Sequence, residues 1–196
     1  MLFKSKSKYD YVIIGLGNPG DKYVDTRHNV GFRCIDVLAE DLGVRIEKNK
    51  FKSLICDAQI ANKKVMLCKP LTFMNNSGTA ASEIVNYYKI PFENIIVISD
   101  DVSMDAGRLR IRKNGSHGGH NGLKDIFELC GTDNIPRVKI GVGQKPHPDY
   151  DLANWVLGKP SKEDYDNIKQ AEKDAANAVK LMIADGIQNA MNKYNR

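Results

Sequence analysis

One histidine, one aspartate and three asparagines stand close behind apolar runs of the sequence, and their functional groups together suit the hydrolysis of an ester. A histidine such as His28 can take a proton from water near neutral pH, and a carboxylate such as Asp100 can fix the tautomer of the ring. The side-chain amides of Asn18, Asn75 and Asn121 could hold a carbonyl group and stabilise the charge that develops on it. Each residue alone also has an ordinary structural explanation, as a helix cap or a strand end.

The sequence favours water as the nucleophile. It contains no Gly-x-Ser-x-Gly elbow, in which a serine would be exposed for attack. The cysteines lie in apolar runs without Cys-x-x-Cys spacing, so we expect them to be small core residues in a reducing compartment rather than activated thiols. They are Cys34, Cys56, Cys68 and Cys130.

Two motifs raise the alternatives of a metal or a cofactor. His117-Gly-Gly-His120 places two histidines in a glycine loop, but no acidic or thiol ligand stands nearby, so a metal site is not expected. Gly15-x-Gly17-x-x-Gly20 after a strand matches the dinucleotide-binding fingerprint. That fingerprint requires a helix that begins inside the glycine motif, whereas Pro19 and a polar loop delay the helix here. We therefore expect no metal and no cofactor, with a nicotinamide-dependent dehydrogenase as the weakest alternative.

The periodicity of the chain indicates elements that would bring the polar residues together. Apolar runs at 11–15, 64–69 and 94–99 have the character of strands, and Asn18, Phe73 to Asn75 and Asp100 follow them. His28 falls in the first turn of a helix that Thr26 would cap and Gly43 would end. A hairpin at 51–69, turning at Asn62-Lys63, implies some antiparallel pairing. We predict an α/β fold, a single-domain three-layer sandwich with a mixed, mostly parallel central sheet flanked by helices, and a ligand crevice beyond the carboxyl ends of its strands.

Two further strands are basic. Alternation at 107–112 would point Arg108, Arg110 and Arg112 to one face of the sheet while Leu109 and Ile111 face the core. The segment 137–142 repeats this pattern, and Lys145 follows it. A solvated strand face and a phosphate-binding surface both fit this pattern, and a nucleic acid is the simplest polyanionic partner.

Length and composition indicate one domain. The chain has 196 residues, of which 42% are apolar and 27% charged, with a formal net charge of +5. We expect a basic tail at 1–9 and a single catalytic domain at 10–196, which ends in a covering helix from Ser161 to Gly186 and a shorter one. Because no run has the length of a signal peptide core or a membrane span, we expect a cytoplasmic protein without a membrane partner.

Several motifs, in order along the chain, resemble those of the bacterial-type peptidyl-tRNA hydrolases. They are GLGNPGDKYVDTRHNVG, KPLTFMNNSG, ISDDVSMDAG, GSHGGHNGLKD, RVKIGVG and WVLGKP. The resemblance implies hydrolysis of the ester that joins a peptide to the 3′ ribose of tRNA, which recycles the tRNA. No obligate protein partner is evident from the sequence, and we expect a monomer. A non-catalytic RNA-binding protein is the alternative that an assay of peptide release would exclude.

The resemblance also assigns roles to individual residues. It makes His28 the base that activates water, Asp100 its orienting carboxylate, and the three asparagines the groups that bind substrate. Tyr23, Phe73 and Met74 would line the site for the peptide and the 3′ end of the tRNA. Arg112 and Lys139 would hold the 5′-phosphate of the tRNA, at positions where the family usually has lysine and arginine respectively. The charge is the same, but arginine and lysine bind phosphate with different geometry.

Overall fold

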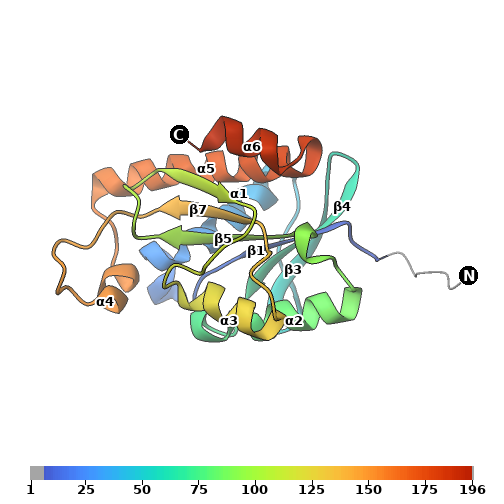
Figure 1. Cartoon of the computed structure of the whole chain (residues 1–196), viewed down its shortest axis with the longest axis horizontal. Helices are drawn as coiled ribbons and strands as arrows, with labels where there is room; N and C mark the ends of the chain where they lie inside the picture. Colours follow the sequence, from blue (N-terminus) through green and yellow to red (C-terminus); the bar gives the residue numbers. More distant parts are fainter. Residues whose placement is uncertain (1–6, 196) are drawn as a thin grey trace, which may run out of the picture.

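The computed structural model describes residues 7–195 as one mixed sheet with helices on both faces (Figure 1). Residues 1–6 of the predicted basic tail, and residue 196, lie outside the described residues. Of the helices in the described part of the chain, none has the length and apolar character that a membrane span requires.

The sheet has seven strands, and its centre is parallel. Their order across the sheet is β2 (Lys48–Lys50), β3 (Ser53–Ile60), β4 (Lys63–Pro70), β1 (Tyr11–Gly15), β5 (Ile95–Asp101), β7 (Arg137–Gly141) and β6 (Leu109–Arg112). β4, β1, β5 and β7 run parallel, while β2, β3 and β6 add antiparallel edges. The predicted mixed α/β sheet is confirmed, and the carboxyl ends of four strands meet at one edge.

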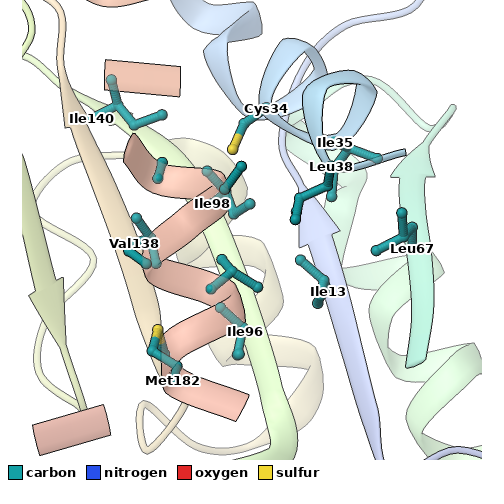
Figure 2. Packing of buried hydrophobic residues seen from close by; sticks show 14 of the residues in the cluster. Ile13, Cys34, Ile35, Leu38, Leu67, Ile96, Ile98, Val138, Ile140 and Met182 are labelled. Atoms are coloured by element: carbon teal, nitrogen blue, oxygen red, sulfur yellow. The ribbon is translucent and has the colours of Figure 1, made fainter. Parts of the chain in front are cut away.

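Apolar side chains on the central strands alternate between two cores. On β1, Ile13 belongs to the core that α1 (Val30–Asp41) and α5 (Lys162–Asp185) help to form, and Figure 2 shows it on the same side of the sheet as Ile35 and Leu38 of α1, near Ile96 of β5. Val12 and Ile14 point to the other face, where α2 (Ser77–Tyr88) and α3 (Asn121–Cys130) cover the sheet. α6 (Ile187–Tyr194) lies beside α5 on the first face (Figure 1). Burial of both strand faces explains the nearly continuous apolar runs.

The glycines of the suspected dinucleotide motif serve close packing. A Cβ on Gly15 would lie 2.2 Å from the carbonyl oxygen of Gly31 in α1, and one on Gly17 would lie 2.5 Å from the ring of Phe32. α1 begins only at Val30, well after Gly20. Because the helix N-terminus does not lie within the glycine motif, the geometry that binds a pyrophosphate is missing, and the dinucleotide alternative was wrong.

Several predicted element ends differ in the structure. His28 lies in a short 3₁₀ turn, η2 (Arg27–Asn29), ahead of α1, and the Thr26 hydroxyl bonds the carbonyl of Tyr23 instead of capping the helix. The hairpin turns at Ala61-Asn62, one residue earlier than predicted, with positive φ at both residues. His120, not Asn121, caps α3. Several short elements were missed, because so few residues show no periodicity. They are β2, the 3₁₀ turns η1 (Asp21–Tyr23), η3 (Met74–Asn76) and η4 (Phe92–Asn94), and the helix α4 (Leu152–Leu157).

Candidate active site

A cleft of about 620 Å³ opens beyond the carboxyl ends of the parallel strands. It is lined by every residue predicted to catalyse or to bind substrate: Asn18, Tyr23, His28, Phe73, Met74, Asn75, Asp100 and Asn121. Lys139 lines it as well, whereas Arg112 is exposed on β6 and is not part of the lining. Strand ends that are distant in sequence thus converge as the topology predicted.

His28 and Asp100 form a buried pair at the floor of the cleft. His28 Nδ1 lies 2.7 Å from Asp100 Oδ1, and Asp100 is only 3% exposed. The carboxylate therefore accepts the Nδ1 hydrogen of the ring, so Nε2 of the neutral imidazole carries the free lone pair. This is the tautomer that a general base requires.

A second histidine, His120, binds the same carboxylate oxygen. Its Nε2 lies 2.9 Å from Asp100 Oδ1, and its Nδ1 accepts the backbone N–H of Leu123 at 3.3 Å, which caps α3. Both ring nitrogens are occupied, since a hydrogen on Nδ1 would face the N–H of Leu123. His120 can orient Asp100 but has no lone pair for taking a proton from water.

Opposing effects set the acidity of this pair. Burial lowers the pKa of His28, but the charge of Asp100 and the hydrogen bond to it outweigh burial, so the pKa of His28 is raised above its usual value. Burial raises the pKa of Asp100, but the two histidines outweigh it and hold the pKa of that carboxyl far below its usual range. Asp100 is therefore the fixed negative charge of the site.

Asn18 joins three segments at the edge of the cleft. Its Oδ1 accepts the backbone N–H of Met74 at 2.8 Å, and its own backbone exchanges two hydrogen bonds of 2.9 Å with the side chain of Asn29. Because Oδ1 is engaged, Nδ2 is left as the donor, and within residues 7–195 it has no protein acceptor. The loop after β1, the turn that carries His28 and the loop after β4 are thus held as one unit.

The rim of the cleft is aromatic and strained on one side. Phe73 is 53% exposed and has φ +59°, a left-handed conformation that costs a residue other than glycine about 1 to 3 kcal/mol. Met74 beside it is buried and packs against α3. Strain of this kind is concentrated at ligand-binding sites, where the surrounding contacts maintain it.

Comparisons with known proteins agree on one family. The family model described as peptidyl-tRNA hydrolase matches residues 12–196. A peptidyl-tRNA hydrolase of Lachnospira eligens is 49% identical over 185 residues, which cover 94% of this chain and 99% of the relative. One of Thermoanaerobacter sp. is 51% identical, with 94% and 99% covered. The chain belongs to the peptidyl-tRNA hydrolase family.

A solved structure supports the same assignment. The crystal structure of peptidyl-tRNA hydrolase from Acinetobacter baumannii superposes with a TM-score of 0.89 at 34% identity, and 94% of each chain is covered. As a peptidyl-tRNA hydrolase the chain is an ester hydrolase that acts on peptidyl-tRNA. The resemblance drawn from the sequence motifs is confirmed.

The basic residues of this peptidyl-tRNA hydrolase are less exposed than the alternation of β7 predicted. Arg110 and Arg112 of β6 face solvent, but Arg137 of β7 is buried at 2% exposure beside Phe127. Lys139 Nζ lies 2.5 Å from Asp101 Oδ2, and Lys145 donates to the carbonyl of Tyr150 in its own loop. Arg108 is exposed but precedes β6, and the basic residues that remain on the paired strands of this face are Arg110, Arg112 and Lys139, which we call the basic strip.

Sequence reasoning missed two participants. His120 was considered only together with His117 as a metal site, although its position after two glycines and before a helix fits a cap. Asn29 follows His28 directly and was not singled out. Of the described residues, His28, Asp100 and His120 form the group whose ligand atoms, all within 4.8 Å, could hold a metal ion. In the hydrogen-bonded arrangement, His28 Nδ1 and His120 Nε2 both carry hydrogens that point to Asp100, so neither nitrogen offers a lone pair to a metal ion.

Proposed function

We propose that the chain hydrolyses the ester between the peptide and the 3′ ribose of peptidyl-tRNA by direct attack of water. His28 Nε2 removes a proton from water as the oxygen attacks the ester carbonyl. The resulting N–H then returns that proton to the departing ribose oxygen. The observation that carries the proposal is the buried 2.7 Å contact between His28 Nδ1 and Asp100 Oδ1, which fixes the required tautomer.

The lack of an alcohol or thiol side chain other than the Tyr23 phenol among the described lining residues supports attack by water. Among the described residues that line the cleft there is no serine, threonine or cysteine. The four cysteines are free and lie elsewhere, and burial raises the pKa of each thiol. The hydroxyl and thiol groups of the usual acyl-enzyme intermediates are thus missing from this lining, and the hydrogen-bonded His28–Asp100 pair is placed to activate water instead.

The remaining lining supplies binding and charge stabilisation. Asn18 Nδ2 and the amides of Asn75 and Asn121 are the neutral donors available to the ester carbonyl as it becomes an oxyanion. Tyr23, Phe73 and Met74 form a wall for the peptide and the terminal adenosine. Arg112 and Lys139 of the basic strip bind the 5′-phosphate of the tRNA. To do so, Lys139 gives up its ion pair with Asp101 and binds the phosphate in its place.

A peptide-release assay tests the proposal. Synthetic N-blocked aminoacyl-tRNA is incubated with the chain in excess chelator, and the released N-blocked amino acid is measured. We expect full activity, and loss of release that zinc or another divalent ion restores would replace the metal-free mechanism. Mass spectrometry of protein quenched within a single turnover provides the second arm. A protein species that carries the acyl group would overturn direct attack by water.

A further inference from the structure

The short helix α4 forms one wall of the cleft and is held mainly by the turn that carries His28. Its side chains Leu152, Ala153, Val156 and Leu157 line the cleft, and Leu152 and Leu157 are each 40% exposed. α4 stands apart from the layers of the sandwich, at the end of the long loop that follows β7 (Figure 1). An apolar wall of this kind needs an anchor if it is to keep its place.

Arg27, the residue before His28, provides that anchor. The carbon at the centre of its guanidinium lies 3.5 Å from the centroid of the Trp155 ring in α4. Its Nη1 donates to the carbonyls of Trp155 and Lys159, at 3.3 and 3.0 Å, and its backbone N–H donates to the carbonyl of Gly158 at 3.1 Å. Trp155 is fixed in turn, because its Nε1 donates to the carbonyl of Gly143 at 3.0 Å.

The surroundings of Arg27 are unusual for a charged residue. It is only 5% exposed, its Nε is buried without a hydrogen-bond partner, and within residues 7–195 no carboxylate forms an ion pair with it. Burying a guanidinium without a paired carboxylate is costly, and burial lowers the pKa of Arg27 against the opposing charge of Asp164. The ring face and the carbonyls of α4 are its main compensation.

We propose that Arg27 is a positioning residue, and that its stack on Trp155 couples the α4 wall to the turn that holds His28. The proposal rests on the function proposed above, in which His28 is the base. A peptide that packs against α4 moves the ring, the guanidinium and the η2 turn together. Binding on the apolar wall is thereby converted into correct placement of His28.

Trp155 offers a direct readout, because it is the single tryptophan of the chain. Arg27→Lys keeps the charge but loses the planar stack and the forked contacts. We expect Trp155 in this variant to become more accessible to acrylamide quenching in the absence of substrate. The Lys159→Ala control, which removes only the exposed ion pair between Lys159 and Asp25, should leave quenching at the wild-type level. Wild-type quenching in Arg27→Lys would overturn the proposal, whether or not the protein proves to be active.

Kinetics provide the second arm. Arg27→Lys and Trp155→Leu should each lower kcat/KM for peptidyl-tRNA by roughly 10- to 30-fold, with KM raised and kcat lowered together. The double variant should be no worse than either single variant, whereas Trp155→Phe, which keeps an aromatic face, should recover most of the activity. Fully multiplicative losses in the double variant would contradict a shared role. Because Trp155 is only half-buried, Trp155→Leu keeps the test valid if Arg27→Lys does not fold.

Discussion

His28 and His120 both bind one oxygen of Asp100, but only one of the two rings can accept a proton. His28 keeps one ring nitrogen free, while both nitrogens of His120 are occupied by Asp100 and the N–H of Leu123. The difference arises from local structure, since His120 is also a helix cap and His28 is not. Our predictions at the scale of single residues follow from this asymmetry.

His28→Ala should lower the rate of peptide release by about 10² to 10⁴, the usual contribution of general base catalysis. Single-turnover hydrolysis of N-blocked aminoacyl-tRNA measures this directly. Asp100→Asn should cost less, and adding it to His28→Ala should cost little more, since Asp100 acts through the ring. His147→Ala, an exposed histidine outside the cleft, is the matched control and should retain the wild-type rate. If folded His28→Ala keeps the wild-type rate, His28 is not the general base.

The pH profile should report the raised pKa of His28. The base acts only when neutral, so kcat should fall as the pH drops through that pKa, which lies above the reference value of about 6.5. In Asp100→Asn the negative charge that raises the pKa is gone while burial, which lowers it, remains. The acidic limb should therefore move to lower pH. A limb that stays in place, or moves upward, would mean that Asp100 does not set the protonation of His28.

Asp101 competes with phosphate for Lys139 and should restrain tRNA binding. The two side chains are 2.5 Å apart, and hydrogen bonds to Lys139 and Ser103 outweigh burial and lower the pKa of Asp101. Asp101→Asn frees the ammonium group, so deacylated tRNA should bind more tightly, which filter binding at low salt would detect. Lys139→Ala in the same background should remove the gain. Equal affinity in Asp101→Asn and the wild type would show that Lys139 does not reach phosphate.

At the scale of elements, the antiparallel pair of β6 and β7 decides which cations share a face. Arg110 lies opposite Lys139, and Arg112 lies opposite Arg137. All four side chains therefore point away from the core that α5 covers, where Leu109, Ile111, Val138 and Ile140 are buried. α3 and the loop before β7 then cover Arg137, whereas Arg110 and Arg112 stay exposed and Lys139 is partly covered beside Asp101.

The basic strip predicts a loss of tRNA affinity without a loss of chemistry. Arg112→Ala and Lys139→Ala should each weaken tRNA binding and reduce the log–log salt slope by about 0.7 to 0.9. Hydrolysis of a minimal peptidyl-nucleotide, which has no 5′-phosphate arm, should be nearly unchanged. Lys193→Ala removes the same charge from α6, on the other face of the sheet, and serves as the control. If the salt slopes of both variants match that of Lys193→Ala, Arg112 and Lys139 are ordinary solvated residues that do not bind phosphate.

For the whole molecule, we predict a monomer. The cleft is formed by a single chain, and none of its walls requires a second copy. Light scattering of the tRNA-free protein at assay concentration should give a mass near 21.9 kDa. A mass twice as large, with activity that falls on dilution, would contradict this prediction.

Much of the fold could be predicted because the chain alternates strongly periodic segments with clear end signals. Gly186 ends α5 and Ser161 caps it, as their positions indicated. The convergence of Asn18, Asp100 and the loop after β4 followed from the rule for strand ends. The sharing of Asp100 by two histidines could not be predicted, since it depends on side-chain directions across β5 and α3. The pairing of Lys139 with Asp101 could not be predicted either, because the alternation of side chains along a strand shows which face of the sheet a residue occupies but not which residue it contacts.

The central position of β1 in the sheet has a consequence for synthesis of the chain. β1 pairs with β4 on one side and β5 on the other, and both follow it in the sequence. The last residue of β5, Asp101, is added 86 residues after Gly15, from 101 minus 15, or about 4 to 17 seconds at usual elongation rates. β4 ends at Pro70 and can pair earlier, so until β5 is complete this apolar strand keeps at least one edge unpaired, which makes the nascent chain a natural client for chaperones at the ribosome.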